Sequence, residues 1–258
     1  MIQKITYEKF GSGSENIIFL HAFPLDGRMW AQQILVLKDQ YTLFVPDMRC
    51  FGKNLSNDAV FCTIDTYADD ILQMMNDENL NKAVLCGLSI GGYIILRCMQ
   101  KFPERISKVI LADTKAENDD NTGLLNRAAT ITKLQDGKQN EVIEGLLGKL
   151  MSKHTIDNKP RVVTDVREMM EQQTALAMQS ATAALAMRIN SKEFLKDIKV
   201  PALILVGADD ALTPPVFSQT LNEQIAGSIL HTIQNAGHLS NMEQPEEFNA
   251  LVMKFLET

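Results

Sequence analysis

A glycine-rich turn between two apolar runs constrains the fold of this chain more than any other feature of its sequence. Residues 82–88 form a short apolar run that is typical of a buried strand, and apolar residues continue beyond the turn toward Met99 in a helical segment. Gly87 and Gly91 flank Ser89 at positions where Cβ atoms would clash, because the serine sits on a strained backbone. The helix that follows would direct the positive end of its dipole toward this serine. The stretch therefore predicts a strand, a sharp turn and a helix that present Ser89 as a nucleophile.

Apolar runs that suit buried strands recur along the chain and alternate with helical patterns. The run from Asn16 to Leu20 is continuous rather than alternating, which is typical of a strand inside a parallel sheet. Strands that alternate with helices predict a mostly parallel central sheet with helices on both faces. The expected strands cover residues 2–10 (an edge strand or hairpin), 16–20, 41–46, 82–88, 108–113, 202–206 and 228–233.

The character of the sequence changes between residues 115 and 190. Strand-like runs disappear there, and alanine, methionine, leucine, glutamine and charged residues dominate at helical spacing, with breaks at Gly137 and Pro160. We expect an inserted helical cap, or lid, of about four helices over residues 115–190. The α/β core domain would then consist of residues 1–114 and 191–258. The methionines of the cap are interpreted as core filler or, alternatively, as an adaptable lining over a binding pocket.

The composition limits the classes of function open to this chain. The formal net charge is −7 and no block of lysine or arginine stands out, which disfavours binding to nucleic acid or to an anionic membrane. The first residues lack the pattern of a signal peptide, and no apolar run is long enough to span a bilayer. The four cysteines show no Cys-x-x-Cys spacing, which disfavours zinc and redox sites. Free thiols without a signal peptide predict a cytoplasmic protein; no oligomeric state is predicted.

Polar residues that can carry chemistry stand where several of the predicted strands end. They are His21, Asp47, Ser89, Asp210 and His238. In open α/β sheets, ligands bind at the carboxyl ends of the strands. We therefore expect these side chains to meet at one edge of the sheet.

Three of these residues predict a catalytic triad. A serine hydroxyl becomes a good nucleophile when a base removes its proton, and histidine suits this role because its pKa lies near neutrality. A carboxylate then fixes the histidine tautomer and stabilises its charged form. The chain offers Ser89, Asp210 and His238 in the order serine, acid, histidine. Singly they could be a turn serine, a helix cap and a loop histidine, but together they favour a triad. Asp209 and Asp113 are alternative acids, and the spacing of the surrounding motif favours Asp210.

Acyl transfer also requires two backbone N–H groups directed at the position where negative charge develops on the substrate oxygen. The first expected donor is Ile90, directly after Ser89 at the start of the predicted helix. The second is Phe23, in the loop that follows the strand over 16–20. His21 begins the same loop, and we expect it to hold the loop by hydrogen bonds rather than to act in catalysis.

Five segments of the chain form a set that occurs together in one known family. They are His21-Ala22-Phe23-Pro24, Asp47-Met48-Arg49-Cys50-Phe51-Gly52, Gly87-Leu88-Ser89-Ile90-Gly91-Gly92, Gly207-x-x-Asp210-x-x-Thr213-Pro214 and Gly237-His238. This set resembles the α/β-hydrolase family, in the branch of small bacterial carboxylesterases and 3-oxoadipate enol-lactonases. The resemblance implies the α/β-hydrolase fold with an inserted helical cap. Two departures are Ala22 and Cys50, which stand where that branch usually has glycine.

The resemblance also implies a reaction. It is that of a serine hydrolase that cleaves a carboxylic ester of a small to medium substrate through an acyl-enzyme, with no metal and no organic cofactor. The alternatives on the same triad are a lactonase of the enol-lactone type, a thioesterase, a C–C hydrolase and a cofactor-free perhydrolase. A further alternative is a catalytically inactive ligand-binding homologue. The expected partner is a small-molecule ester or lactone, with His21, Lys115 and Arg127 as candidate substrate contacts. Solvent exposure is the simpler interpretation of Lys115 and Arg127.

Overall fold

The computed structural model describes residues 4–55 and 61–258, and within them seven strands form a single sheet in the order β1-β3-β2-β4-β5-β6-β7. All neighbouring strands are parallel except β1, which pairs antiparallel with β3 at one edge. The mostly parallel sheet predicted from the sequence is thus confirmed. The strands are β1 (Tyr7–Phe10), β2 (Asn16–Leu20), β3 (Thr42–Pro46), β4 (Ala83–Leu88), β5 (Ile106–Ala112), β6 (Ala202–Gly207) and β7 (Ile229–Ile233).

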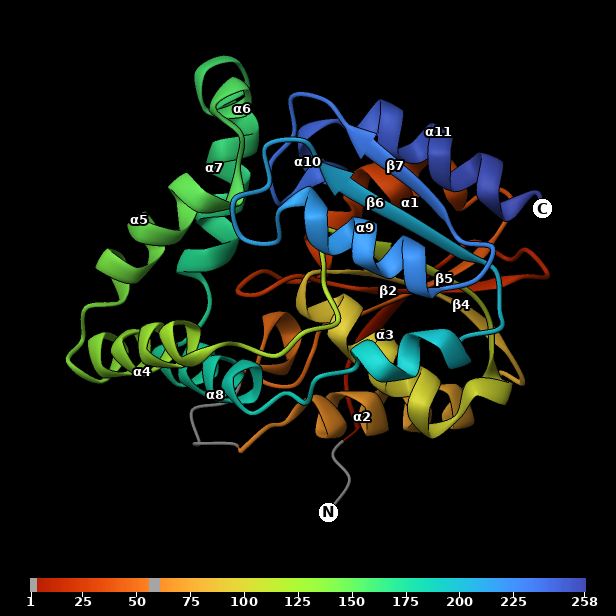
Figure 1. Cartoon of the computed structure of the whole chain (residues 1–258), viewed down its shortest axis with the longest axis horizontal. Helices are drawn as coiled ribbons and strands as arrows, with labels where there is room; N and C mark the ends of the chain where they lie inside the picture. The colour runs from red at the N-terminus through yellow and green to blue at the C-terminus, as the bar shows by residue number, and fades with distance from the viewer. Residues whose placement is uncertain (1–3, 56–60) are drawn as a thin grey trace.

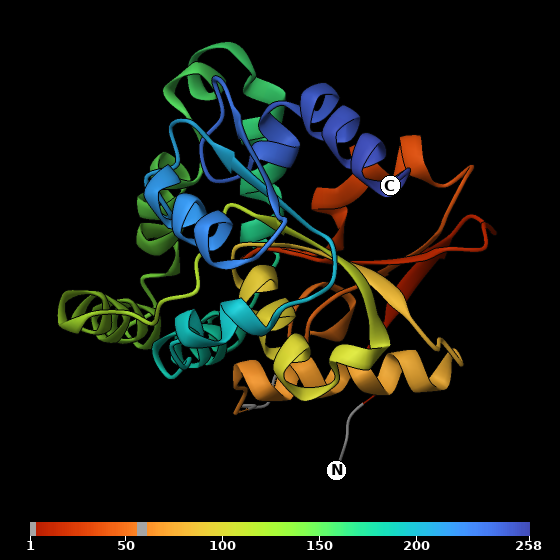
Figure 2. The ribbon, with the colours of Figure 1, turned by 45° about the vertical axis from the view of Figure 1, so that its right-hand side comes forward.

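Helices cover both faces of the sheet. Figure 2 shows α1 (Ala31–Leu37) and α11 (Pro245–Leu256) on one side, and α2 (Ile64–Asp77) and α3 (Ile90–Lys101) on the other. The short α10 (Ser240–Glu243) packs with α1 and α11, and α9 (Pro215–Gln224) packs on β6 and β7. Because both faces are covered, β4 and β6 are buried along their whole length, which explains their continuous apolar sequences. The 3₁₀ helices are η1 (Gly27–Trp30), η2 (Gly52–Asn54), η3 (Pro103–Arg105) and η4 (Lys192–Asp197).

The segment between β5 and β6 is helical and lies beside the sheet (Figure 1). The sequence predicted about four helices over residues 115–190, and the described structure has five. The difference is the short α6, which begins because the Ser152 side chain accepts a hydrogen bond from the Thr155 amide, and which ends just before Pro160 starts a new helix. We refer to residues 115–190 as the cap. Its helices are α4 (Asn121–Gln135), α5 (Gln139–Leu150), α6 (Lys153–Asn158), α7 (Pro160–Glu171) and α8 (Ala175–Ala186).

None of the helices among the described residues combines the length and the apolar content needed to cross a membrane. Across residues 4–55 and 61–258, no three His, Cys, Asp or Glu side chains are grouped as a metal ion would require. The four cysteines are free thiols, and all of them are buried.

Candidate active site

Ser89 lies at the tip of the turn between β4 and α3, in a backbone conformation that few residues adopt. Its φ of 56° and ψ of −112° fall outside the common regions. Its N–H donates to the carbonyl of Ala112 over 3.0 Å, and the Thr114 hydroxyl donates to the Ser89 carbonyl over 2.8 Å. A Cβ at Gly91 would stand 2.3 Å from the Leu20 carbonyl oxygen, so only glycine lets α3 approach β2 this closely. The turn predicted from the sequence is present. Hydrogen bonds to neighbouring residues hold Ser89 in its strained backbone conformation.

Asp210 and His238, which follow β6 and β7, form a buried hydrogen-bonded pair. Asp210 Oδ2 lies 2.8 Å from His238 Nδ1, and both residues are at most 3% exposed. The Thr213 hydroxyl donates to the same carboxylate oxygen over 2.7 Å. Oδ1 accepts hydrogen bonds from the amides of Leu212 and Thr213 at 2.8 and 2.9 Å. The carboxylate is therefore fixed from both sides, with one oxygen facing the imidazole.

The electrostatics of this pair favour an ionised carboxylate beside an imidazole that accepts protons readily. Burial alone would lower the pKa of His238, but the charge of Asp210 and its hydrogen bond outweigh burial and raise that pKa above the ordinary 6.5. Burial would raise the pKa of Asp210, but His238 and the donors from Thr213 lower it below 3.8. Since an ionised carboxylate only accepts hydrogen bonds, Nδ1 carries a proton and the neutral ring keeps its lone pair on Nε2.

The loop that carries His238 is held by the cap and by a buried glutamate. The His238 amide donates to the carbonyl of Leu150, the last residue of α5, over 2.9 Å. Glu243 is fully buried, and it accepts hydrogen bonds from the amides of Gly237 at 2.8 Å and Ser152 at 2.7 Å. Glu243 was not among the residues predicted from the sequence. The sequence shows only that an acidic residue follows shortly after Gly237-His238. It gives no sign of the contact with the Ser152 amide, because the cap is distant in sequence.

The two alternative acids lie in different surroundings. Asp209 is exposed. Asp113 is fully buried, accepts the Gly207 amide at 2.8 Å, and accepts the Ser240 hydroxyl at 2.5 Å. Burial and the charge of Asp210 hold the pKa of Asp113 well above its usual range. Within the described residues His238 hydrogen-bonds neither of them, so the geometry favours Asp210 as the partner of the histidine.

Ser89 and His238 line the same cavity, which has a volume of about 110 Å³. Its other core residues are Phe23, Tyr93, Leu212 and Thr213, and the cap contributes charged residues and leucines, including Leu146 of α5. The cavity thus lies between the carboxyl ends of the strands and the cap. This is the edge of the sheet at which the polar strand ends were expected to meet.

Of the two expected oxyanion donors, one directly follows the nucleophile in the chain and the other lines the same cavity. Ile90 is the first residue of α3, where amides have no carbonyl partner within the helix. Phe23 lines the cavity with Ser89. Neither amide donates a hydrogen bond to another protein group in the described part of the chain. Ala22, at the position where the resemblance implies glycine, is fully buried, and its amide donates to the Met29 sulfur at 3.1 Å. Alanine is therefore accommodated in the loop before Phe23.

His21 belongs to the scaffold of this loop rather than to the wall of the Ser89 cavity. It is fully buried and is not part of the cavity wall. Its Nε2 accepts the Met48 amide at 2.8 Å, so its Nδ1 is the protonated nitrogen, which lies 3.0 Å from the Ala22 carbonyl. With both ring nitrogens engaged, His21 joins the loop after β2 to the loop after β3. In the latter loop, Cys50 has a φ of 73°, a left-handed conformation that glycine adopts with less strain.

Charged side chains that the sequence placed at the start of the cap also reach the cavity. Lys115 and Arg127 both line it, together with Asp119. Arg127 Nε lies 3.1 Å from Asp119 Oδ2, and Arg188 Nη2 lies 2.7 Å from Asp119 Oδ1. The simpler interpretation, that Lys115 and Arg127 are exposed to solvent, holds only in part, since both side chains are only partly exposed. Asp119 and Arg188 gave no signal in the sequence, because α4 and α8 bring them together only in the fold.

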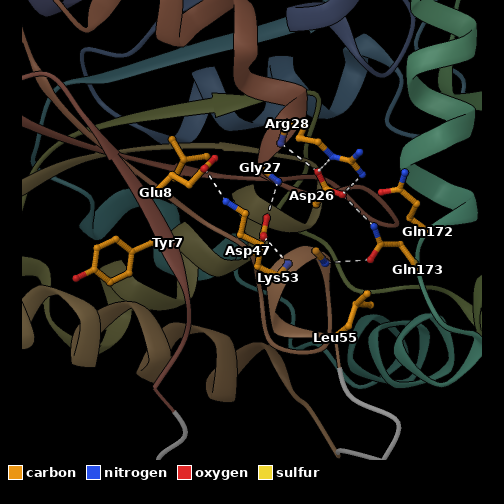
Figure 3. A pocket seen from close by; sticks show the side chains of 12 residues that line it. Tyr7, Glu8, Asp26, Gly27, Arg28, Asp47, Lys53, Leu55, Gln172 and Gln173 are labelled. Atoms are coloured by element: carbon orange, nitrogen blue, oxygen red, sulfur yellow. Dashed lines mark hydrogen bonds and ion pairs between the residues drawn. The ribbon is translucent and has the colours of Figure 1, made fainter.

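A second pocket of about 290 Å³ lies near Asp47 and contains neither Ser89 nor His238. Figure 3 shows Asp47 at its centre, with Gln173 reaching in from the cap. Asp47 accepts the amides of Gly27 at 2.8 Å and Lys53 at 2.7 Å, and Gln173 donates to Asp26 over 3.1 Å. This pocket is larger than the Ser89 cavity, but it lacks a nucleophile paired with a base. Its carboxylates Asp26 and Asp47 accept hydrogen bonds from protein groups, which favours a structural role for them. Of the polar residues at the strand ends, Asp47 therefore has a structural role, because it holds the loops at Gly27 and Lys53 by hydrogen bonds.

Comparisons with known proteins agree with this geometry. The family described as the alpha/beta hydrolase fold matches residues 15–245. The chain is 27% identical over 249 residues to "3-oxoadipate enol-lactonase 2" of Acinetobacter baylyi, covering 96% of this chain and 91% of the relative. A thermophilic esterase from Thermogutta terrifontis, solved with malate bound, superposes with a TM-score of 0.94 at 31% identity, covering 98% of this chain and 93% of that one. The enol-lactonase from Burkholderia xenovorans shares the fold, with a TM-score of 0.90 at 24% identity over 98% and 96% of the two chains.

Proposed function

The chain belongs to the α/β-hydrolase family, and we propose that it is a serine hydrolase that cleaves a carboxylic ester through an acyl-enzyme. The observation that carries the proposal is the buried 2.8 Å hydrogen bond between Asp210 and His238, with His238 and Ser89 in the wall of one cavity. A strained serine, a histidine of raised pKa and an ionised acid are the groups that nucleophilic acyl transfer requires.

In the proposed reaction, His238 Nε2 takes the proton of the Ser89 hydroxyl as its oxygen attacks the ester carbonyl. The amides of Ile90 and Phe23 donate hydrogen bonds to the oxyanion that forms. His238 then protonates the leaving alcohol, and an acyl group remains on Ser89. A water molecule, deprotonated by His238, releases the acid by the same route. Asp210 keeps the imidazole oriented and stabilises its charged form throughout.

The size of the cavity supports a small substrate. Its volume of about 110 Å³ is below the roughly 300–1,000 Å³ of pockets that hold drug-sized ligands. We therefore assign a short to medium acyl or alcohol group to the cavity. The cap gives it an apolar part through Leu146, Leu150 and Leu185, beside the charged side chains at the start of the cap.

A lactone is the second candidate substrate class, because a relative that aligns with nearly the whole chain is named as an enol-lactonase. The steps are the same, except that the leaving oxygen stays covalently joined to the acyl group, so hydrolysis gives a single product. Thioesters, C–C bonds and peroxide-dependent transfer remain alternatives on the same triad. A panel of 4-nitrophenyl esters, lactones and acyl thioesters separates these classes by the kcat/KM of each.

A fluorophosphonate activity probe tests the nucleophile directly. We expect wild-type protein to be labelled and Ser89→Ala to be unlabelled, with the adduct mapped to Ser89 by peptide mass spectrometry. Ser12→Ala removes a hydroxyl from an exposed site and should be labelled like wild type. Absence of labelling in folded wild-type protein would contradict the hydrolase and favour the ligand-binding homologue. Labelling that persists in Ser89→Ala would assign the nucleophile to another residue.

A further inference from the structure

The basic residues around the Ser89 cavity differ in whether an acid neutralises them. Arg127 and Arg188 both form ion pairs with Asp119, at 3.1 and 2.7 Å. Burial opposes ionisation of Asp119, but the two guanidinium groups outweigh it and lower its pKa to about 2. Asp119 is therefore ionised at neutral pH, and its two oxygens are taken by the two arginines.

Lys115 is in a different situation. It lines the cavity that contains Ser89 and His238, and it is half-buried. Its ammonium lies 4.7 Å from the centre of the Phe217 ring, a cation–π contact. Within the described residues no carboxylate lies within ion-pair distance of it, and Asp119 and Glu117 act on it only at longer range. A ring face attracts the positive charge but does not replace the oxygen acceptors that an ammonium prefers, so its N–H donors stay available to an anion.

This environment is unfavourable for a lysine unless an anion joins it. Burial and the positive charge of Arg188 lower the pKa of Lys115 from its usual range. A desolvated cation gains more from a partner of opposite charge than an exposed one does, because water screens the pair less. Lys115 and Ser89 line the same small cavity. The anion that would pair with this cation is therefore one carried by a bound substrate.

We propose that Lys115 forms an anion-binding subsite, and that the preferred substrates of this enzyme carry a carboxylate in addition to the ester or lactone that is cleaved. The inference rests on the proposed function, because it concerns the same cavity. A single unpaired ammonium in about 110 Å³ fits one carboxylate on a short chain. Half-esters of short dicarboxylic acids and lactones that bear a carboxylate are the corresponding compounds.

A matched pair of esters tests the subsite. The two compounds are 4-nitrophenyl pentanoate and mono-4-nitrophenyl glutarate, whose acyl chains have the same length but end in a methyl group or a carboxylate. We expect wild type to have the higher kcat/KM for the glutarate ester, after subtraction of the reaction without enzyme. In Lys115→Gln the ratio of the two kcat/KM values should fall about tenfold or more, through KM of the glutarate ester. Lys115→Arg keeps the charge and should keep most of the preference.

Lys149→Gln is the control, since it removes the same charge from an exposed position of α5 and should leave the ratio unchanged. The wild-type ratio should also fall as salt screens the attraction between Lys115 and the carboxylate. This measurement needs no variant, so a ratio that does not change with salt overturns the subsite even if Lys115→Gln does not fold.

The outcomes separate this inference from the proposed function. Hydrolysis that depends on Ser89 but shows no preference for the glutarate ester, or a preference unaffected by Lys115→Gln, overturns the subsite alone. Probe labelling of Ser89 without hydrolysis of the glutarate ester does the same. Failure of both the labelling and the hydrolysis overturns the proposed function and the subsite with it.

Discussion

The carboxylate of Asp210 divides its hydrogen bonds between two tasks. Oδ1 accepts the amides of Leu212 and Thr213 and so fixes the loop after β6. Oδ2 accepts the Thr213 hydroxyl and faces His238. The sequence offered a helix-capping role and a catalytic role for this residue as alternatives. In the structure Pro214 is the N-cap of α9, and Asp210 instead fixes the loop before that helix. The carboxylate can do this and face His238 as well, because each of its oxygens has more than one lone pair.

Replacing Asp210 with asparagine separates the two tasks. The amide oxygen can still accept the backbone N–H groups, so we expect the variant to fold. Its NH₂ group would donate to Nδ1 of His238 and move the ring proton to Nε2, the nitrogen that must accept the proton of Ser89. We therefore expect kcat to fall by ~10⁴-fold, the size of effect seen when this change is made in a serine–histidine–aspartate triad.

Steady-state kinetics on a 4-nitrophenyl ester measures this loss, with circular dichroism to verify folding. Asp209→Asn makes the same change at the exposed neighbouring position and should retain wild-type kcat. Near-normal turnover in Asp210→Asn would move the acid role to Asp113 or Asp209.

The pH profile of kcat/KM should report His238. The pKa of His238 is raised above 6.5, because Asp210 outweighs the effect of burial. The imidazole must be neutral to act as base, so kcat/KM should rise with pH through a midpoint above 6.5 and then level off. The stabilisation that the raised pKa gives to the fold has the opposite trend, since it is complete below pH 6.5 and is lost as pH rises through the folded pKa. Removing the charge in Asp210→Asn should move the midpoint to lower pH, and a wild-type midpoint below 6.5 would refute this account.

At the scale of elements, the site depends on how closely α3 packs against β2 and β4. A Cβ at Gly87 would stand 2.5 Å from the backbone of Gly91, and a Cβ at Gly91 would stand 2.3 Å from the Leu20 carbonyl oxygen. Backbone atoms cannot move aside as a flexible side chain can. The two glycines therefore hold the turn at Ser89 by allowing contact between main chains, and the sequence pattern is readable because no other residue allows it.

Gly91→Ala should accordingly destabilise the protein by about 2 kcal/mol or more, the usual cost of forcing extra volume into a packed region. Urea unfolding followed by circular dichroism measures the free energy of unfolding. Gly145→Ala is the matched control, because Gly145 lies inside α5, where an added Cβ would meet no atom of a neighbouring element within 4 Å. Alanine favours the helix there by roughly 0.5–1 kcal/mol, so this variant should be more stable than wild type. Equal stability of Gly91→Ala and wild type would contradict the packing argument.

At the scale of the whole molecule, the core was predictable from the sequence to a greater extent than the cap was. The residues Ser89, Asp210 and His238 stand directly after apolar runs, and the edge of a parallel sheet brings such positions together whatever their separation in sequence. Contacts that the cap makes with the core, and contacts within the cap, have no comparable rule. The pairing of His238 with the Leu150 carbonyl and that of Arg188 with Asp119 depend on how α4, α5 and α8 pack. For that reason the triad could be proposed from the sequence, while the ion pairs among the described residues, which engage Arg127 but not Lys115, required coordinates.

The cap should then decide which acyl groups enter the Ser89 cavity, and Leu146 of α5 tests this. Leu146→Ala removes side-chain volume from the cavity wall, so the acyl chain that gives the highest kcat/KM should lengthen relative to wild type. A series of 4-nitrophenyl esters from acetate to octanoate measures the profile. Leu125→Ala makes the same truncation on cap helix α4, where the leucine is 71% exposed, and should leave the profile unchanged. An identical profile in Leu146→Ala and wild type would mean that the cap does not limit the acyl group, and that selectivity lies in the core side of the cavity.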